Sequence, residues 1–186
     1  MKLHFSKEEM FNLNEKRLLE RGVSIESIAM IAFNQQCKYT PNTKMTDCIE
    51  SVKKILTYTD VFHLVQLSIE IDRLTEEKAF RYPIQDILSS DLGMFGVDEI
   101  VGLRISSLFG TIGQTNFGDI DVNKPGIVKE LNDLGKINPN ICHTFLDDVV
   151  GAIAAAASTR VAQIMSREIS LLDASWEKSL DIGNII

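Results

Sequence analysis

The segment 149–157 places the strongest constraint on the fold, because it consists only of valine, glycine, alanine and isoleucine. A helix with no polar face has to be buried in a protein core or in a membrane. The run has about half of the roughly 18 apolar residues that a membrane span needs, and it begins directly after two carboxylates, Asp147 and Asp148. We therefore expect a helix over residues 145–167 at the centre of a helical bundle.

Amphipathic patterns earlier in the chain predict helices that surround this central one. Ser6 and Glu9 have the spacing of a capping box, which predicts a first helix over residues 7–21. Ser24 is expected to start a second helix, which ends at the turn formed by residues 39–42.

The rest of the chain continues the helical pattern. The expected elements are a third helix capped by Thr43 or Thr46, a fourth capped by Thr59, a short one from Pro83 to residue 88, one over 97–109, and one over 127–134 closed by Gly135. Residues 170–186 are a further helix or a frayed tail. No run alternates polar and apolar residues between hairpin turns. We predict an all-α fold: a single-domain bundle over residues 1–186, with the Ala-rich helix at its centre.

The net charge and the cysteine content limit the classes of binding partner and the cellular compartment that are expected. The net charge of −7, without a cluster of lysine and arginine, argues against nucleic acid and against simple electrostatic docking on anionic lipid. The three cysteines form no Cys-x-x-Cys pair, and the first ten residues lack the basic-then-apolar order of a signal peptide. A soluble protein of the reducing cytoplasm is expected, without a transmembrane segment; peripheral membrane contact and homo-oligomerisation stay open.

An acidic pattern occurs twice. Asp98-Glu99-Ile-Val-Gly102 and Asp147-Asp148-Val-Val-Gly151 share the order acid, acid, aliphatic, aliphatic, glycine. In each helix the glycine lies beneath the acidic side chains, which predicts a groove there and a close approach of another helix. If the two helices pack at this point, four carboxylates converge.

Converging carboxylates predict a divalent cation. Like charges about 5 Å apart repel by about 3 kcal/mol at an effective dielectric constant of ~20, so something positive should neutralise them. Carboxylate oxygens without a cysteine and histidine set favour Mg²⁺, or Mn²⁺, over Zn²⁺. The alternative is two separate, solvated helix ends, in which Thr144 and Asp147 form an ordinary capping box.

The segment 110–126 lies between the two acidic helices, and its glycines predict a loop. Its second part carries Asp119, Asp121 and Lys124 and is expected to close over the acidic pairs. A lysine there would meet a phosphate oxygen, and an aspartate would bind metal or position water. Ordinary turn chemistry explains the same residues. Asp119-Ile-Asp121 also has the form of the haloacid-dehalogenase nucleophile motif, but the β-strand that this motif requires is missing.

Three further features near the acidic pairs have competing explanations. Gly110-Thr-Ile-Gly113 could donate backbone N–H groups to phosphate, although a helix end explains the glycines equally well. His143 could act as an acid or base, or as a structural hydrogen-bonding group. Cys142 lacks the sequence context of a catalytic thiol.

The motifs of residues 97–157, taken in order, resemble those of phosphatidylglycerophosphatase A. They are Asp98-Glu99-x-x-Gly102, Phe117-x-x-x-Asp121-x-x-Lys124-Pro125 and Phe145-Leu-Asp147-Asp148-Val-Val. The chain is most similar to the soluble, all-helical branch of Gram-positive bacteria. It departs from the family in lacking the early Pro-Gly-Thr-x-Gly-Ser motif and the membrane-spanning helices, and in carrying Gly118 where the family has an arginine.

The resemblance implies a Mg²⁺-dependent lipid phosphatase that removes the terminal phosphate of phosphatidylglycerophosphate. The expected metal ligands are Asp98, Glu99, Asp147 and Asp148, and the expected catalytic residues are Asp121, Lys124, His143 and Asp148. Lys124 and Asn116 are expected to bind the substrate, which is a phosphate-bearing small molecule or a lipid head group. Two alternatives stay open: an all-α nucleotide pyrophosphohydrolase, and a relative without enzymatic activity that binds a metal or a partner.

Overall fold

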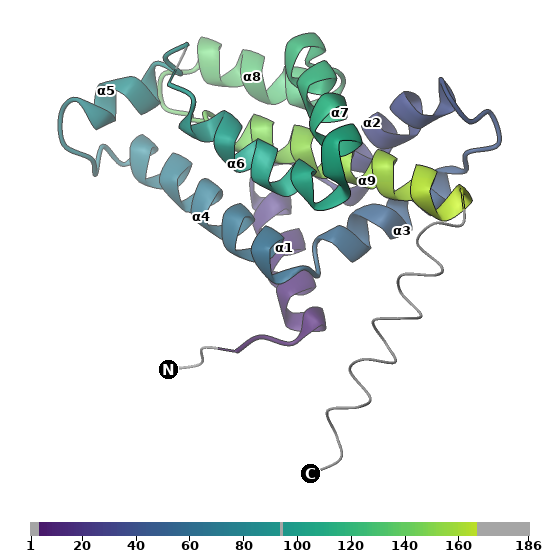
Figure 1. Cartoon of the computed structure of the whole chain (residues 1–186). Coiled ribbons are helices and arrows are strands. Elements are labelled where there is room, and N and C mark those ends of the chain that lie inside the picture. Colours follow the sequence, from purple (N-terminus) through teal and green to yellow (C-terminus); the bar gives the residue numbers. More distant parts are fainter. Residues whose placement is uncertain (1–3, 94, 167–186) are drawn as a thin grey trace.

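Helices make up all of the regular structure in the computed structural model, which describes residues 4–93 and 95–166 (Figure 1). In chain order they are α1 (Lys7–Glu20), α2 (Ile25–Cys37), α3 (Met45–Ile55), α4 (Thr59–Glu76), α5 (Ile84–Ser89), α6 (Val97–Ser106), the short 3₁₀ helix η1 (Ser107–Phe109), α7 (Gly110–Asn123), α8 (Ile127–Ile137) and α9 (Leu146–Met165). No strand occurs among these residues, so the all-α prediction is confirmed.

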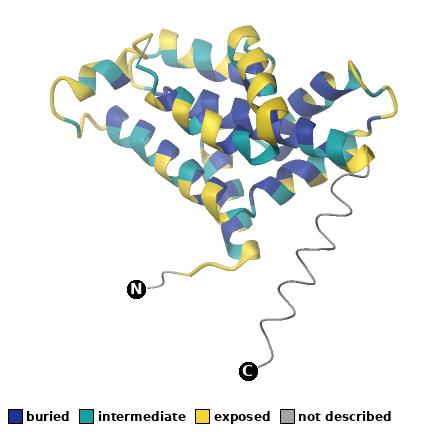
Figure 2. Cartoon of the chain, viewed as in Figure 1, coloured by how far each residue is buried: buried dark blue, intermediate teal, exposed yellow. Residues whose placement is uncertain are grey.

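Helix α9 forms the centre of the bundle. Every side chain from Leu146 to Thr159 is buried, and Figure 2 shows the buried residues concentrated along this helix. Helices α2, α3, α6, α7 and α8 all pack against it. Because many of its contact residues are alanines, the neighbouring helices can approach closely. The predicted central position of the Ala-rich helix is confirmed.

The capping box predicted for the first helix is present, and Ser24, the predicted start of the second helix, forms one too. The backbone N–H of Glu9 donates to Ser6 Oγ over 3.2 Å, and the backbone N–H of Ser6 donates to Glu9 Oε2 over 2.8 Å. In α2, the backbone N–H of Ser27 donates to Ser24 Oγ over 3.1 Å. These bonds satisfy amide groups that a helix start would otherwise leave without partners.

The threonine caps predicted for α3 and α4 are wrong. Neither helix has a side-chain cap, and Thr46 and Thr59 lie inside their first turns. Thr43 instead donates its hydroxyl to the carbonyl of Thr40 over 2.7 Å. Burial of the apolar faces, rather than a cap, therefore determines where these helices begin.

Helix α7 occupies most of the segment 110–126, for which a loop was predicted. Phe117 and Ile120 are buried beneath it. A Cβ atom on Gly113 would lie 2.2 Å from the carbonyl oxygen of Ser106, so only glycine lets α7 pack this closely on the end of α6. The burial of the apolar side chains thus outweighs the cost of about 1 kcal/mol for each glycine in a helix.

Smaller differences concern helix ends. The predicted helix over 97–109 is divided into α6 and η1, and α8 continues through Gly135 to Ile137 instead of closing at the glycine. The predicted element over 170–186 lies outside the described residues. Within residues 4–93 and 95–166, no helix is both long and apolar enough to cross a membrane.

Candidate functional site

The first turns of α6 and α9 bring three carboxylates together. Asp98 and Glu99 belong to α6 and Asp148 belongs to α9; one oxygen of each lies within 4.8 Å of the oxygens of the other two. Helix α6 begins at Gly96, whose φ of 74° lets the preceding loop turn into the helix. Asp98 and Asp148 are buried, so little water lies between their charges.

Phe117 of α7 fills the space beneath these carboxylates. A Cβ atom on Gly102 would lie 2.3 Å from Cζ of the Phe117 ring, and a Cβ atom on Gly151 would lie 3.1 Å from Cγ2 of Ile120. The two motif glycines therefore admit α7 into the junction of α6 and α9. The groove predicted there is not open, because an aromatic ring occupies it.

Asp147 points toward a different partner. Lys124 Nζ lies 2.9 Å from Asp147 Oδ2, 2.6 Å from Asp121 Oδ1 and 3.6 Å from Asp148 Oδ1. Burial lowers the pKa of the Lys124 amine, but Asp147 and Asp121 outweigh this effect and the pKa is raised. The structure thus assembles three of the four expected metal ligands and pairs the fourth with lysine.

The clustered carboxylates hold their protons more tightly than free aspartate. Burial, followed by the charge of Asp147, raises the pKa of Asp148 to about 9. Burial and the neighbouring Glu99 raise the pKa of Asp98 to about 7. Burial also raises the pKa of Asp147 to about 6, against the opposing effect of Lys124. The raised pKa values disfavour full ionisation of the cluster at neutral pH, and a cation placed beside it would favour the ionised carboxylates.

Two unsatisfied oxygens indicate that a cation fits. Asp98 Oδ1 and Glu99 Oε2 are buried, and no amide, amine or hydroxyl donor among the described residues reaches either oxygen; the two carboxyls can bond only by sharing a proton with each other. Buried polar atoms without partners are rare because losing their hydration is costly. Together with Asp148, they form a set of hard oxygen ligands of the kind that Mg²⁺ and Mn²⁺ prefer.

A cavity of about 230 Å³ opens beside the three carboxylates. Its lining includes Asp121 and Lys124, the loop residues Asp91, Leu92 and Gly93, and two residues of α8, Asn132 and Lys136. The sequence analysis missed the contributions of the loop and of α8. The four-residue spacing of Asn132 and Lys136 places them on one side of a helix, but no sequence signal links that helix to the acidic motifs.

Asn116 does not belong to this site. Its side chain donates to Thr159 Oγ1 over 3.0 Å, and its carbonyl accepts from Gln35 over 3.2 Å. It lines a separate cavity with Ile112 and Ala162. Since residues 110–123 form a helix, Asn116 lies about 1.4 turns before Asp121 and about two turns before Lys124, rather than beside them in a closing loop.

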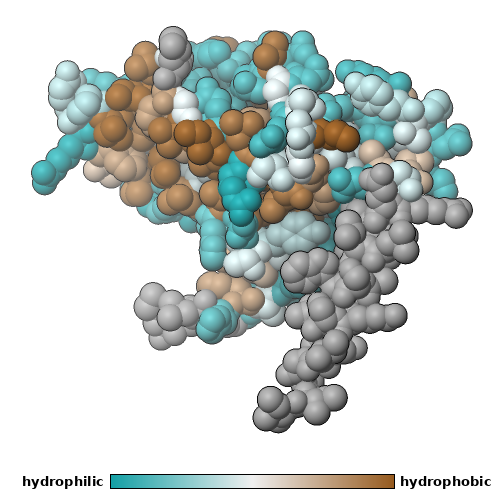
Figure 3. Space-filling model, viewed as in Figure 1, coloured by the Kyte–Doolittle hydropathy of each residue, from teal (hydrophilic) through white to brown (hydrophobic). Residues whose placement is uncertain are grey.

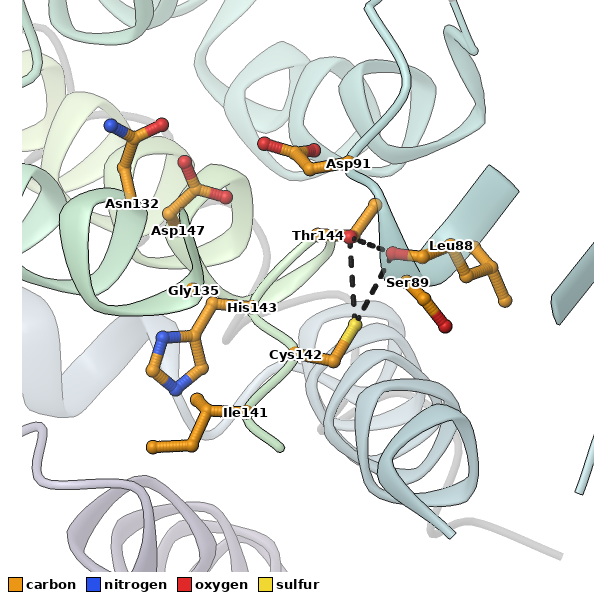
Figure 4. Close-up of a pocket in the computed structure, with 10 residues that line it drawn as sticks. All are labelled: Leu88, Ser89, Asp91, Asn132, Gly135, Ile141, Cys142, His143, Thr144 and Asp147. Carbon is orange, nitrogen blue, oxygen red and sulfur yellow. Dashed lines mark hydrogen bonds between the residues drawn. The ribbon is translucent and has the colours of Figure 1, made fainter. Parts of the chain in front are cut away.

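His143 and Cys142 line a smaller neighbouring pocket (Figure 4). Figure 4 shows the His143 ring directed away from Asp147, and its Nδ1 lies 2.9 Å from the carbonyl oxygen of Leu131. Burial lowers the pKa of His143, which keeps the ring neutral. Burial also raises the pKa of the Cys142 thiol to about 11, so a thiolate nucleophile is disfavoured there. Neither residue lines the acidic cavity.

Comparison with known proteins assigns the chain to a family. The sequence model of phosphatidylglycerophosphatase A matches residues 27–163. The chain belongs to this family. The match extends from α2 to α9 and thus reaches far beyond residues 97–157, where the motifs lie.

The chain is similar to other bacterial proteins in sequence and, where structures are known, in fold. The chain is 44% identical to the uncharacterized protein YutG of Bacillus subtilis over 146 residues, which cover 78% of this chain and 86% of YutG. The crystal structure of YpjQ from B. subtilis matches with a TM-score of 0.82 and 40% identity, covering 88% of this chain and 99% of that one. The low temperature requirement C protein of Listeria monocytogenes matches with a TM-score of 0.80 and 40% identity, covering 84% and 97%.

Asp72 of α4 fixes the start of α9, the helix that carries the second acidic motif. Its carboxylate accepts the backbone N–H of Phe145 over 3.1 Å and that of Leu146 over 3.0 Å. The capping box expected between Thr144 and Asp147 is absent, because Thr144 donates its hydroxyl to the carbonyl of Leu88 over 2.7 Å. A cap supplied by a distant helix leaves Asp147 free to pair with Lys124, and no local sequence signal indicates it.

Proposed function

We propose that this member of the phosphatidylglycerophosphatase A family is a Mg²⁺-dependent phosphomonoester hydrolase that acts on a phosphatidylglycerophosphate-like lipid head group. The observation that carries the proposal is the carboxylate trio of Asp98, Glu99 and Asp148, with its two buried oxygens that no amide, amine or hydroxyl donor of the described residues reaches. These residues lie within the part of the chain that the family model matches, and a cavity large enough for a phosphate adjoins them.

Asp98, Glu99 and Asp148 would hold the cation. When bound there, Mg²⁺ supplies charge stabilisation for phosphoryl oxygens. A loose phosphoryl-transfer transition state depends mainly on placement and charge, so the site needs no serine or cysteine nucleophile. The raised pKa values of Asp98 and Asp148 mean that these carboxylates lose protons when the cation enters.

Asp121 is the residue best placed to orient the attacking water. It lies on the cavity wall, and Lys124 Nζ holds its Oδ1 over 2.6 Å. We assign to its Oδ2 the acceptance of the water proton as the water oxygen bonds to phosphorus. The bond from phosphorus to the leaving alcohol breaks, and the proton that Asp121 accepted passes through water in the cavity to the leaving oxygen, which regenerates the carboxylate; His143 does not line this cavity.

In this proposal, Lys136 binds the phosphate of the substrate and neutralises part of its negative charge. Lys124 was the expected phosphate ligand, but three carboxylates already surround its amine. Lys136 lines the same cavity and forms no ion pair within the described part of the chain, and Asn132 lies one helical turn before it.

The test measures phosphate release by chelated, repurified protein with and without Mg²⁺ or Mn²⁺. The substrates are phosphatidylglycerophosphate in detergent, soluble monoesters and nucleoside triphosphates, the last of which would be cleaved by the alternative pyrophosphohydrolase. We expect metal-dependent release of phosphate from the monoesters, fastest from phosphatidylglycerophosphate. The Asp148→Asn variant should release none. The matched control is Asp119→Asn, an exposed position on α7 that does not line the cavity. Failure to release phosphate from any monoester would refute the proposal.

A further inference from the structure

An apolar face lies beside the acidic cavity. Figure 3 shows a band of hydrophobic side chains over α5, α6 and the adjoining part of α4. We name this band the α4–α6 face; its exposed members are Leu67, Ile84, Leu92, Val97, Ile100 and Leu103. Ile100 is 63% exposed and Leu67 is 55% exposed. Contiguous exposed apolar surface of this kind marks an interaction site.

Helix α6 contributes three of the exposed apolar side chains of the α4–α6 face. The solvent side of a surface helix is normally polar, whereas α6 turns Val97, Ile100 and Leu103 outward. Its exposed cation on this side, Arg104, is already paired with Asp60 of α4. The outer side of α6 is therefore suited to an apolar partner rather than to water.

The face is continuous with the cavity. Leu92 belongs to the face and also lines the cavity, together with Gly93. Val97 directly precedes Asp98 and Glu99 on α6. A molecule that lies on the α4–α6 face is thus next to the cavity that holds the carboxylates.

We propose that the α4–α6 face docks on a lipid bilayer, so that a phosphorylated head group enters the cavity while its acyl chains remain in the membrane. This inference rests on the proposed function. No described helix can span a bilayer, so such a substrate has to be reached from the membrane surface. Tyr82, 83% exposed beside Ile84, has the amphipathic side chain typical of the head-group level.

The nature of the contact follows from its residues. The net charge of −7 offers no attraction to anionic lipid, so binding depends on apolar burial. Such binding persists at high salt, whereas electrostatic binding is screened. Salt dependence therefore separates this face from a lysine-mediated contact.

The experiment compares two double variants of the full chain by sedimentation with sucrose-loaded vesicles of phosphatidylcholine and phosphatidylglycerol, at low and high salt and without substrate. Ile100→Gln/Leu103→Gln changes the face. Leu19→Gln/Met30→Gln is the matched control on α1 and α2, where the side chains are 55% and 48% exposed. We expect the first variant to bind vesicles about tenfold more weakly, at both salt concentrations, and the control to bind like wild type.

Turnover provides the second measurement. The face variant should hydrolyse vesicle-embedded substrate slowly but should retain wild-type turnover of a short-chain substrate below its micellar concentration. Unchanged vesicle binding would overturn the inference. A shift from dimer to monomer in the face variant, with vesicle binding intact, would also overturn it and assign the face to a second copy. Because vesicle binding is measured without turnover, an inactive wild type would contradict the proposed function alone.

Discussion

At the scale of single residues, the two lysines of the cavity are expected to differ in role. Lys124 is surrounded by Asp121, Asp147 and Asp148, so its charge is used within the protein. Lys136 is exposed at the rim and forms no ion pair in the described residues. Replacing Lys124 should disturb the acidic site itself, whereas replacing Lys136 should weaken the hold on substrate.

We predict that Lys136→Ala raises KM for a phosphate ester about fivefold and leaves kcat nearly unchanged, because an exposed charge contact contributes about 1 kcal/mol to ground-state and transition-state binding alike. Lys136→Arg should restore most of the loss. Lys129→Ala is the control, since Lys129 lies on the same helix but pairs with Asp133. Steady-state kinetics with a soluble monoester provide the readout, and an unaltered KM would show that Lys136 does not contact substrate.

Single residues also show where sequence reasoning reaches its limit. The repeated acidic motif identified Asp98, Glu99 and Asp148 as neighbours, because helix periodicity places them on packed helix ends. It could not separate Asp147 from them, since the partner of Asp147 is a lysine brought in by α7. Asp72 was undetectable for the same reason: its cap is formed across seventy-three residues of sequence.

At the scale of elements, α7 was the main error. Its glycines predict a loop by local propensity. The assembled bundle gives Gly113 a packing role, whereas a Cβ atom on Gly110 or Gly118 would meet nothing within 4 Å. Gly113 faces the Ser106 carbonyl, and the buried Phe117 fits beneath Gly102 of α6. Local propensity is a weak signal when a helix buries one side completely. The amphipathic helices without glycines were easier to predict because their periodicity and burial agree.

The packing of α7 gives a prediction for Gly102→Ala. The added methyl group would lie 2.3 Å from the Phe117 ring, so the ring or α7 has to shift. We expect the free energy of unfolding to fall by about 2 kcal/mol, as is typical of overpacked cores. Gly118→Ala is the control: its Cβ would meet nothing within 4 Å, so stability should rise by about 0.5–1 kcal/mol. Urea denaturation measures both, and equal stability of the two variants would contradict this account of the glycines.

At the scale of the whole molecule, the fold was more predictable than the site. One apolar segment required a buried centre, and amphipathic periodicity supplied the helices around it, so the all-α bundle followed from pattern alone. The cavity depends on the loop before α6 and on one side of α8, which approach the carboxylates only in the folded chain. The helical fold can therefore be predicted from local sequence patterns. The cavity cannot, because it depends on contacts between residues far apart in the sequence, which leave no local pattern.

The last prediction concerns the pH dependence of stability without metal. The pKa of Asp148 is about 9 and that of Asp98 is about 7, both above the ordinary 3.8 of aspartate. The folded chain therefore holds more protons than the unfolded chain between pH ~4 and ~9, and the free energy of unfolding falls as pH rises through this window. The stabilisation that protonated Asp98 and Asp148 give to the folded chain is fully present only below pH ~4. We expect the Tm of chelated protein to fall by about 5 °C between pH 6 and 9.

Saturating Mg²⁺ should remove most of this fall, because the cation binds the ionised carboxylates and its stabilisation increases with pH. Asp72, whose pKa burial raises to about 8, lies outside the cavity and should account for the part that remains. Asp148→Asn should flatten the metal-free profile, whereas Asp119→Asn should keep the wild-type slope. Differential scanning calorimetry across this pH range measures each profile. If the Tm of the wild-type protein has the same pH dependence with and without Mg²⁺, the carboxylate trio does not bind the ion. Binding of Mg²⁺ changes the pH dependence of Tm only if the carboxylates release protons when the ion binds.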